Sequence, residues 1–595
     1  MSQAAAISFV AAPRILVAAM AAIAIAAAVG TARGQAAAPS AAGSISPTAT
    51  IAPSPAAGSV GAELQALANA GTLAELHWPD FSQYKDSVVE FYNAGGWTPA
   101  WIVNGAPTPS ALGMIELFKQ ARLKGLDPAD YDGGRWLVRF ERLRAHAPNP
   151  PAGEVARFDL ALTVCAMRYI SNLRIGRVNP RAVKFYLDVG PKTLDLARTL
   201  RDEFIHAPDP AAIITQVEPP YAGYQRAEAA LAHYLELARA GDGPALPMPA
   251  ASVHPGDAYA GIAQLAARLR LVGDLPPAAV ASADATRYQG ALVDAVKRFQ
   301  QRHGLAPDGV LGKATVATMN MPLRYRVEQL DYTLERYRWM PLEFPEPPIV
   351  VNIPEFILRT MRRQPAPFLE MRVVVGKAYR HQTPVFAGML RYVIFRPWWN
   401  VPYSITRGEL IAKIVRDRGY LASHNYAVFN AAGTLVSDGP VSDATLAGLR
   451  SGALNIRQKP GPKNALGLVK FMFPNSYNVY LHSTPAPELF DRSRRDFSHG
   501  CIRVRHPVAL AAWVLRGRPE WTVDRIEQTM NGNQTVQVNL ASPIPVLILY
   551  STAVVEPDGE VRFFDDIYGY DAELRQALAA RHRTEAGGGG APTAR

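Results

Sequence analysis

Cysteine is scarce in this sequence, since Cys165 and Cys501 are its only two cysteines in 595 residues. So few cysteines exclude the disulfide-dense scaffold of a small secreted protein. Long apolar runs are missing after residue 30, which excludes a chain with several membrane spans and indicates a soluble body. The sequence also lacks a glycine-rich phosphate loop and a dinucleotide-binding fingerprint.

The sequence also lacks the patterns typical of metal binding and of nucleic-acid binding. His424, His482, His499 and His506 do not form a metal-ligand spacing such as His-Glu-x-x-His, so we expect no metal and no other cofactor. A net charge of +11 favours an anionic neighbourhood. No dense Lys/Arg stripe is interleaved with aromatic residues, so a membrane surface or an acidic envelope polymer is expected rather than nucleic acid.

The N-terminus carries a predicted export signal. A basic residue precedes an apolar run at 15–30, and small residues then place cleavage after Ala32 or Ala38. The run is near the lower limit for a membrane span, so an uncleaved anchor is the alternative. We expect a signal peptide or N-terminal anchor at 1–38 and a disordered Ala/Ser/Pro/Gly-rich linker at 39–63.

Export changes what the two cysteines imply. In an oxidising compartment the default is a disulfide between Cys165 and Cys501. However, Leu162 and Tyr169 share one face of a predicted helix with Cys165. We therefore expect Cys165 to pack in a core and Cys501 to remain a free thiol.

A histidine and the second cysteine form a candidate acyl-transfer site. His482 precedes the stretch Ser-His-Gly-Cys-Ile-Arg-Val at 498–504 by fifteen intervening residues. In such chemistry a thiolate attacks a carbonyl while an imidazole takes and returns the proton. Gly500 removes side-chain bulk where the carbonyl must approach. This arrangement resembles the active-site signature of YkuD-type L,D-transpeptidases, which crosslink bacterial peptidoglycan.

The resemblance implies a role for each residue of this signature. Cys501 is the expected nucleophile and His482 the expected general base, oriented by the backbone carbonyl of Ser483. A nearby imidazolium would activate the thiol. The backbone amides of Gly500 and Cys501 are candidate oxyanion donors.

Three further residues of the signature are candidates for substrate binding. His499 lies too close to the cysteine along the chain to act as its base, so His499 and Ser498 are interpreted as fixing the loop. Arg503 would either bind a carboxylate of a peptidoglycan stem or form an internal salt bridge.

Two upstream loops also resemble the large-enzyme subfamily. Trp399 and Asn400 lie in the first, and Asn464 lies in the second; all three are candidates to line the donor site. The family places a capping subdomain between these loops, here at 407–452. A lid of this kind would exclude water and favour an amine as acceptor.

The rest of the chain divides into a helical part and a β-rich part. Helical segments at 64–250 resemble the scaffold of large Gram-negative L,D-transpeptidases. The residues Val296, Phe299, Gln300 and Leu305, followed by the turn at 308–312, resemble the motif of a three-helix peptidoglycan-binding domain, which we expect at 255–322. We expect a catalytic domain at 346–555 and a flexible tail at 583–595. The predicted fold is a multidomain α+β protein whose catalytic domain is a mainly antiparallel β-sandwich with a capping insertion. Trp97 and Trp101 would either stack on sugars or anchor a core.

Local patterns predict individual elements. Ser110 is the expected N-cap of a helix that starts at 111. Further helices are expected at 154–173, 224–240, 262–269, 292–305 and 314–320. Strands are expected at 348–354, 371–376, 390–395, 477–482, 536–540 and 545–550.

These expectations combine into one predicted function. The protein would be a periplasmic L,D-transpeptidase, free or anchored to the inner membrane, that joins peptidoglycan tetrapeptide stems as donor and acceptor through an acyl-thioester on Cys501. Carbapenems would acylate the same thiol. The alternatives are an L,D-carboxypeptidase, transfer to an amine of an envelope protein, and a non-enzymatic peptidoglycan-binding scaffold. A papain-like protease is disfavoured, because there the cysteine precedes its histidine.

Overall fold

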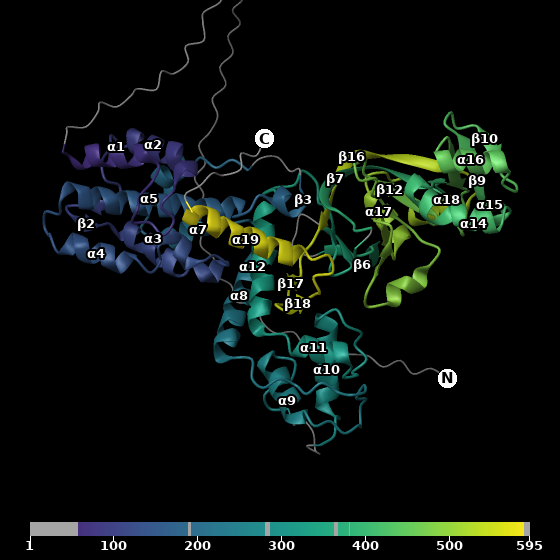
Figure 1. The fold of residues 1–595 in the computed structure, drawn as a ribbon, viewed down its shortest axis with the longest axis horizontal. Helices are drawn as coiled ribbons and strands as arrows, with labels where there is room; N and C mark the ends of the chain where they lie inside the picture. The colour runs from purple at the N-terminus through teal and green to yellow at the C-terminus, as the bar shows by residue number, and fades with distance from the viewer. Residues whose placement is uncertain (1–57, 188–191, 280–285, 362–366, 380, 588–595) are drawn as a thin grey trace, which may run out of the picture. The chain divides into compact units, whose positions relative to one another are not determined.

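The computed structural model describes residues 58–187, 192–279, 286–361, 367–379 and 381–587 (Figure 1). The signal peptide or anchor expected at 1–38 lies outside these ranges, as does most of the predicted linker at 39–63. Among the described residues, every helix is too short or too polar to cross a membrane.

The first part of the structure is a helical scaffold built around one long buried helix, α5. It also contains a short hairpin of β1 (Ile102–Val103) and β2 (Ala106–Pro107). Its helices are α1 (Val60–Ala70), α2 (Lys85–Ala94), α3 (Pro109–Lys119), α4 (Trp136–Arg144), α5 (Ala152–Ile175), α6 (Leu196–Thr199), α7 (Pro210–Val217) and α8 (Ala222–Ala240).

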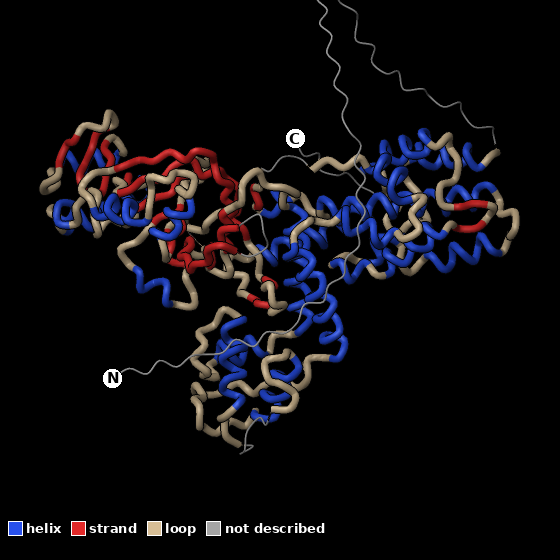
Figure 2. The backbone as a smooth tube through the Cα atoms, turned by 180° about the vertical axis from the view of Figure 1, so that it is seen from behind, coloured by secondary structure: helices blue, strands red, loops and turns tan. Residues whose placement is uncertain are grey.

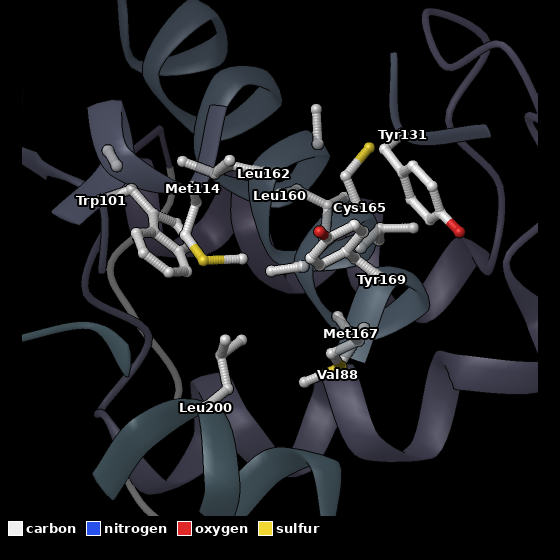
Figure 3. Close-up of a cluster of buried hydrophobic side chains, with 14 of the residues drawn as sticks. Val88, Trp101, Met114, Tyr131, Leu160, Leu162, Cys165, Met167, Tyr169 and Leu200 are labelled. Carbon is white, nitrogen blue, oxygen red and sulfur yellow. The ribbon is translucent and has the colours of Figure 1, made fainter. Parts of the chain in front are cut away.

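Cys165 lies on α5 and is fully buried in the scaffold core, among the side chains of Figure 3. Both cysteines are free, as expected from the helical pattern around Cys165. Trp97 and Trp101 are buried in the same core, and the Trp101 indole donates to Thr163 Oγ1 at 2.9 Å. The two tryptophans are therefore core anchors, and a sugar-stacking role is wrong for them.

The predicted N-cap of α3 is wrong by two residues. Thr108 is the cap, because its hydroxyl accepts from the Ala111 N–H at 3.1 Å. Ser110 lies within the first turn of the helix and is buried, and its hydroxyl donates instead to the Phe204 carbonyl. Pro109 at the first helical position marks this start better than Ser110 does.

The second part is a three-helix domain around its own core. Its helices are α9 (Ile262–Leu271), α10 (Ala291–Arg302) and α11 (Lys313–Met319). Gln300 is buried, and its amide donates to Asp308 Oδ1 and the Val310 carbonyl while its oxygen accepts from the Gly309 N–H. This polar residue of the motif therefore holds the turn between two helices.

The helix α12 (Leu323–Trp339) follows and packs along α8. Glu335 of α12 is fully buried, accepts from the Arg177 and Val178 backbone N–H groups and pairs with the guanidinium groups of Arg177 and Arg338. This network ties α12 to the loop after α5. The described part of the chain ends with a hairpin, β17 (Ala553–Val555) and β18 (Val561–Phe563), and the helix α19 (Tyr570–Gly587), which enters the segment predicted as a tail.

The strands are concentrated in the third part (Figure 2), in a mostly antiparallel sheet that closes on itself. The order runs β12-β13-β15-β6-β5-β4-β16-β7, and β12 pairs again with β7. The ring strands are β4 (Ile349–Asn352), β5 (Ile357–Met361), β6 (Pro367–Gly376), β7 (Val385–Phe395), β12 (Val469–Met472), β13 (Leu481–His482), β15 (Ile502–Val504) and β16 (Val536–Leu549).

Outside the ring, β3 (Phe185–Tyr186) pairs with β7, and β14 (Asp496–Ser498) pairs with β6. The helices α17 (Pro507–Val514) and α18 (Val523–Asn531) complete this part.

The β-rich part departs from the sequence prediction in two strands. The strands expected at 536–540 and 545–550 are one strand, β16, because an irregularity between Asn539 and Ile544 lets it pair with β7 on both sides. The strand expected at 477–482 shortens to β13. The Asn475 side chain explains this, since it bonds the backbone of Phe473, Tyr477 and Val479 and so holds the preceding residues in a loop.

An insertion between β7 and β12 forms a small subdomain, which we call the lid. It has its own core and a sheet of order β10-β9-β11-β8. The pairing of Asn400 with Arg457 closes its base, so the lid spans 399–458 rather than 407–452. Its elements are β8 (Trp399–Asn400), α13 (Tyr403–Ile405), the π-helical turn Thr406–Leu410, α14 (Ile411–Arg416), α15 (Tyr420–Ser423), β9 (Tyr426–Asn430), β10 (Leu435–Ser437), α16 (Asp443–Ser451) and β11 (Leu454–Gln458).

Candidate active site

Three neighbouring strands of the ring build the site on one face. In β13 and β15 the inward residues Leu481 and Ile502 are buried in the core and lie opposite each other. Because side chains alternate across a strand, the residues beside them point to the other face. That face contributes to a cavity of about 850 Å³ lined by Lys470, Tyr480, His482, Cys501 and Arg503, among others.

His482 is held as a neutral imidazole. Its ring is buried, and Nδ1 lies 2.5 Å from the Ser483 carbonyl oxygen, which can only accept. This contact places the proton on Nδ1 and leaves Nε2 as an acceptor. Burial, together with the positive charges of Arg503 and Lys470, lowers the pKa of His482 to about 3. The expected imidazolium is therefore wrong, and the neutral ring is suited to act as a general base.

Hydrogen-bond donors and positive charges around the Cys501 thiol oppose the effect of burial on its pKa. Burial raises the pKa of Cys501, while hydrogen bonds from Tyr480 and the positive charges of Lys470 and Arg503 lower it. The Tyr480 hydroxyl keeps its proton, because burial and the neighbouring thiol raise the pKa of Tyr480. Tyr480 is thus placed to donate to the sulfur and to stabilise the thiolate as it forms.

The loop before Cys501 is fixed by Ser498. Its hydroxyl donates to the Cys501 carbonyl at 2.5 Å and accepts from the Gly500 N–H at 3.1 Å. Gly500 has a φ of 113°, a conformation that a residue with a side chain rarely adopts. Since its N–H is already bonded to Ser498, Gly500 is not the free oxyanion donor that the sequence suggested. The Cys501 amide remains the candidate for that role.

The lid supplies the opposite wall of the cavity. Trp399 and Asn400, the candidates from the first upstream loop, line this cavity. The Trp399 side chain lies close enough to the Tyr480 hydroxyl to lower the pKa of Tyr480, so the lid reaches the residue beside the thiol. His499 faces the lid, with Nε2 2.6 Å from Glu409 Oε1. The catalytic loop and the lid are therefore in direct contact.

Two predicted binding residues lie in contrasting environments. Arg503 lines the cavity, its buried Nε has no hydrogen-bond partner, and no carboxylate of the described chain lies within ion-pair distance. An internal salt bridge is thus disfavoured for Arg503. Asn464 does not line the cavity, because it is buried and its amide donates to the carbonyls of Pro397, Gln458 and Lys459. Asn464 therefore holds the loop rather than facing the site.

Sequence reasoning missed Tyr480 and Lys470. Tyr480 could have been found, because it precedes His482 by two residues and so shares its face of a strand. Lys470 lies directly opposite His482 in the pairing of β12 with β13. That register joins distant segments, and no local pattern around residue 470 signals it.

Comparisons with known proteins agree with this geometry. Residues 347–524 match the family described as "L,D-transpeptidase catalytic domain". Residues 86–231 match a "Scaffold domain", and residues 259–319 match a "Putative peptidoglycan binding domain". The β16 strand lies beyond the catalytic match and still belongs to the same ring.

A curated relative supports the same assignment. The chain is 34% identical over 229 residues to a "Putative L,D-transpeptidase" of Haemophilus influenzae, and the match covers 38% of this chain. It spans about half of the relative's own length, at 45%. The chain thus carries a YkuD-type L,D-transpeptidase catalytic domain, accompanied by a scaffold domain and a peptidoglycan-binding-type domain.

Proposed function

We propose that the protein is an L,D-transpeptidase that uses Cys501 to form 3–3 crosslinks between peptidoglycan stems. The observation that carries the proposal is the shared face of β13 and β15, where a thiol and a neutral imidazole line one cavity. The matched catalytic domain supports the same reaction class. A peptidoglycan substrate implies the cell envelope as the place of action.

In the acylation step, His482 Nε2 takes the thiol proton and the sulfur attacks the carbonyl of the L-to-D bond of a tetrapeptide stem. The Cys501 amide stabilises the oxyanion. The carbon–nitrogen bond then breaks, and the proton held by His482 moves to the leaving amine of the terminal D-residue. An acyl-thioester remains on Cys501.

In the transfer step, an amine from a second stem replaces the thiol. His482 takes a proton from this amine as it attacks the thioester, and the thiolate leaves and recovers a proton. The product is a new amide bond between two stems. With water in place of the amine, the same steps give an L,D-carboxypeptidase, so product analysis separates these two outcomes.

The proposal is tested by intact-mass analysis of the purified chain with a carbapenem, beside Cys501→Ala. Carbapenems imitate the acyl donor, so we expect one adduct on the wild type and none on the variant. Cys165 remains in both proteins, and its complete burial makes it the internal control for nonspecific acylation. A wild-type thiol that is free and yet forms no adduct would contradict the proposed activity.

A further inference from the structure

Lys470 is a cation of the active-site cavity that no carboxylate neutralises. It lies on β12, and Nζ is 3.8 Å from the centroid of the Tyr480 ring. Among the described residues, no acceptor lies within hydrogen-bond distance of Nζ, and Glu409 is the single carboxylate among the residues that line the cavity. Glu409 contacts His499. Lys470 is half-buried, and a positive charge that is partly removed from water without an acceptor is costly, which points to a ligand that supplies one.

The position of Lys470 relative to the reacting groups is set by strand pairing. The nucleophile precedes β15, the base is on β13, and Lys470 is on β12, in register with the base. Neighbouring strands lie about 4.8 Å apart. His482 thus lies between Arg503 on β15 and Lys470 on β12, and Cys501 precedes Arg503 by two residues. Lys470 is therefore the cation on the side of the base that faces away from the nucleophile's strand.

The order of these residues across the sheet indicates how the donor stem would lie in the site. The scissile carbonyl must lie at the sulfur, and the leaving nitrogen must face His482 to receive its proton. The carboxylate of the leaving residue is attached two bonds beyond that nitrogen, roughly 3 to 4 Å from the scissile carbon. A carboxylate that lies beyond His482, on the side away from the nucleophile's strand, would meet the ammonium of Lys470 on β12.

We propose that Lys470 binds the C-terminal carboxylate of the leaving D-residue, and so selects stems in which the scissile bond is the last peptide bond. The inference rests on the proposed transpeptidase function. The Tyr480 ring holds the ammonium in place through a cation–π contact. A stem with one more residue would present an uncharged amide at this position and leave Lys470 without a partner.

The inference is tested with two donor peptides, a tetrapeptide stem with a free C-terminal carboxylate and the same peptide as its C-terminal amide. Release of the terminal residue gives kcat/KM for each. We expect the wild type to favour the acid by at least about tenfold, the range of a charge-assisted hydrogen bond. Lys470→Met should lose this factor on the acid and keep its rate on the amide.

Control variants separate this role from others. Lys470→Arg should retain part of the preference, and Lys470→Gln provides a second uncharged replacement if the methionine variant does not fold. Lys459→Met removes the same charge from a partly exposed position just after the lid, where Lys459 pairs with Asp438, and should leave the preference unchanged. Loss of the preference in Arg503→Gln, rather than in the Lys470 variants, would assign the carboxylate to Arg503.

Two other outcomes would overturn the inference. An equal loss on both donors in Lys470→Met would mean that the ammonium acts on the thiol, and a preference that persists would mean that it does not contact the carboxylate. A failure of the proposed function is a different result. In that case the wild type releases no residue from either donor, although its thiol is free and the protein is folded.

Discussion

The electrostatics of Cys501 and His482 set the expected pH dependence. A thiolate–imidazolium pair would be reactive from acidic pH upward. Here the pKa of His482 is lowered to about 3 and the pKa of Cys501 is raised, so both groups are neutral at pH 6. The thiol therefore ionises only as the pH rises.

We predict that alkylation of Cys501 by iodoacetamide rises along a single limb, with a midpoint above ~8.5, the ordinary thiol value. The rate is measured by intact mass between pH 5 and 10. Cys501→Ala corrects for Cys165, whose burial raises its pKa. A plateau already reached at pH 5 to 6 would show an ion pair and contradict the neutral site.

At the residue scale the sequence predicted which residues line the cavity better than it predicted their protonation states. The motif led to Cys501, His482 and the orienting Ser483 carbonyl, because each is fixed by local sequence. It could not predict a neutral imidazole, since the charges of Lys470 and Arg503 reach His482 across two strand pairings. The prediction that Asn464 lines the donor site failed for a related reason, because the hydrogen bonds of its side-chain amide lie inside the loop.

At the element scale, the lid should control which nucleophile reaches the thioester. Asn400 and Arg457 are paired, so a short glycine-containing turn can replace 401–456 and leave the ring core intact. We predict that this deletion raises hydrolysis several-fold relative to crosslinking, because water then reaches the acyl-enzyme.

The lid prediction is measured by chromatography of the products from a tetrapeptide donor with an amine acceptor. Carbapenem acylation of the shortened protein serves as the control, since it reports an intact thiol without an acceptor. An unchanged ratio of hydrolysis to crosslinking would show that the lid does not exclude water.

The sequence predicted most long elements and missed short ones for a physical reason. Helices such as α5 and α10 have an apolar periodicity that spans several turns, and they appear close to their expected bounds. The junction within β16 is fixed by pairing with β7, which no local window contains. β13 is shortened by bonds of the Asn475 side chain to nearby backbone, which the alternation of apolar residues does not reveal. The base of the lid depends on the same kind of distant pairing.

At the scale of the whole molecule, Glu335 should be a major contributor to stability. It is fully buried between two arginines, and although burial raises the pKa of Glu335, the charges of the arginines outweigh this effect and lower the pKa. Glu335→Gln would leave these arginines without a counter-charge, and we predict a loss of about 3–5 kcal/mol in the free energy of unfolding. Urea unfolding followed by circular dichroism measures it.

Glu328→Gln is the matched control for Glu335, because Glu328 lies on the same helix in a partly exposed pair with Arg575. The Glu328→Gln variant should lose no more than about 1 kcal/mol in the free energy of unfolding. Since the folded pKa of Glu335 lies below its unfolded value of ~4.3, its contribution is complete above that pH and is lost as the pH falls through the folded pKa. Equal losses in both variants would contradict this role.

The closure of the strand ring has a consequence for how catalytic competence is gained and lost. Shifting one strand by a single residue would turn Lys470, His482 or Cys501 from the cavity into the core. In an open sheet, such a slip can be absorbed at an edge. Here β12 and β7 are paired, so every strand of the ring has two neighbours and a slip must pass around the whole circuit. Catalytic alignment is therefore an all-or-none property, and activity should disappear in the same cooperative step that opens the ring.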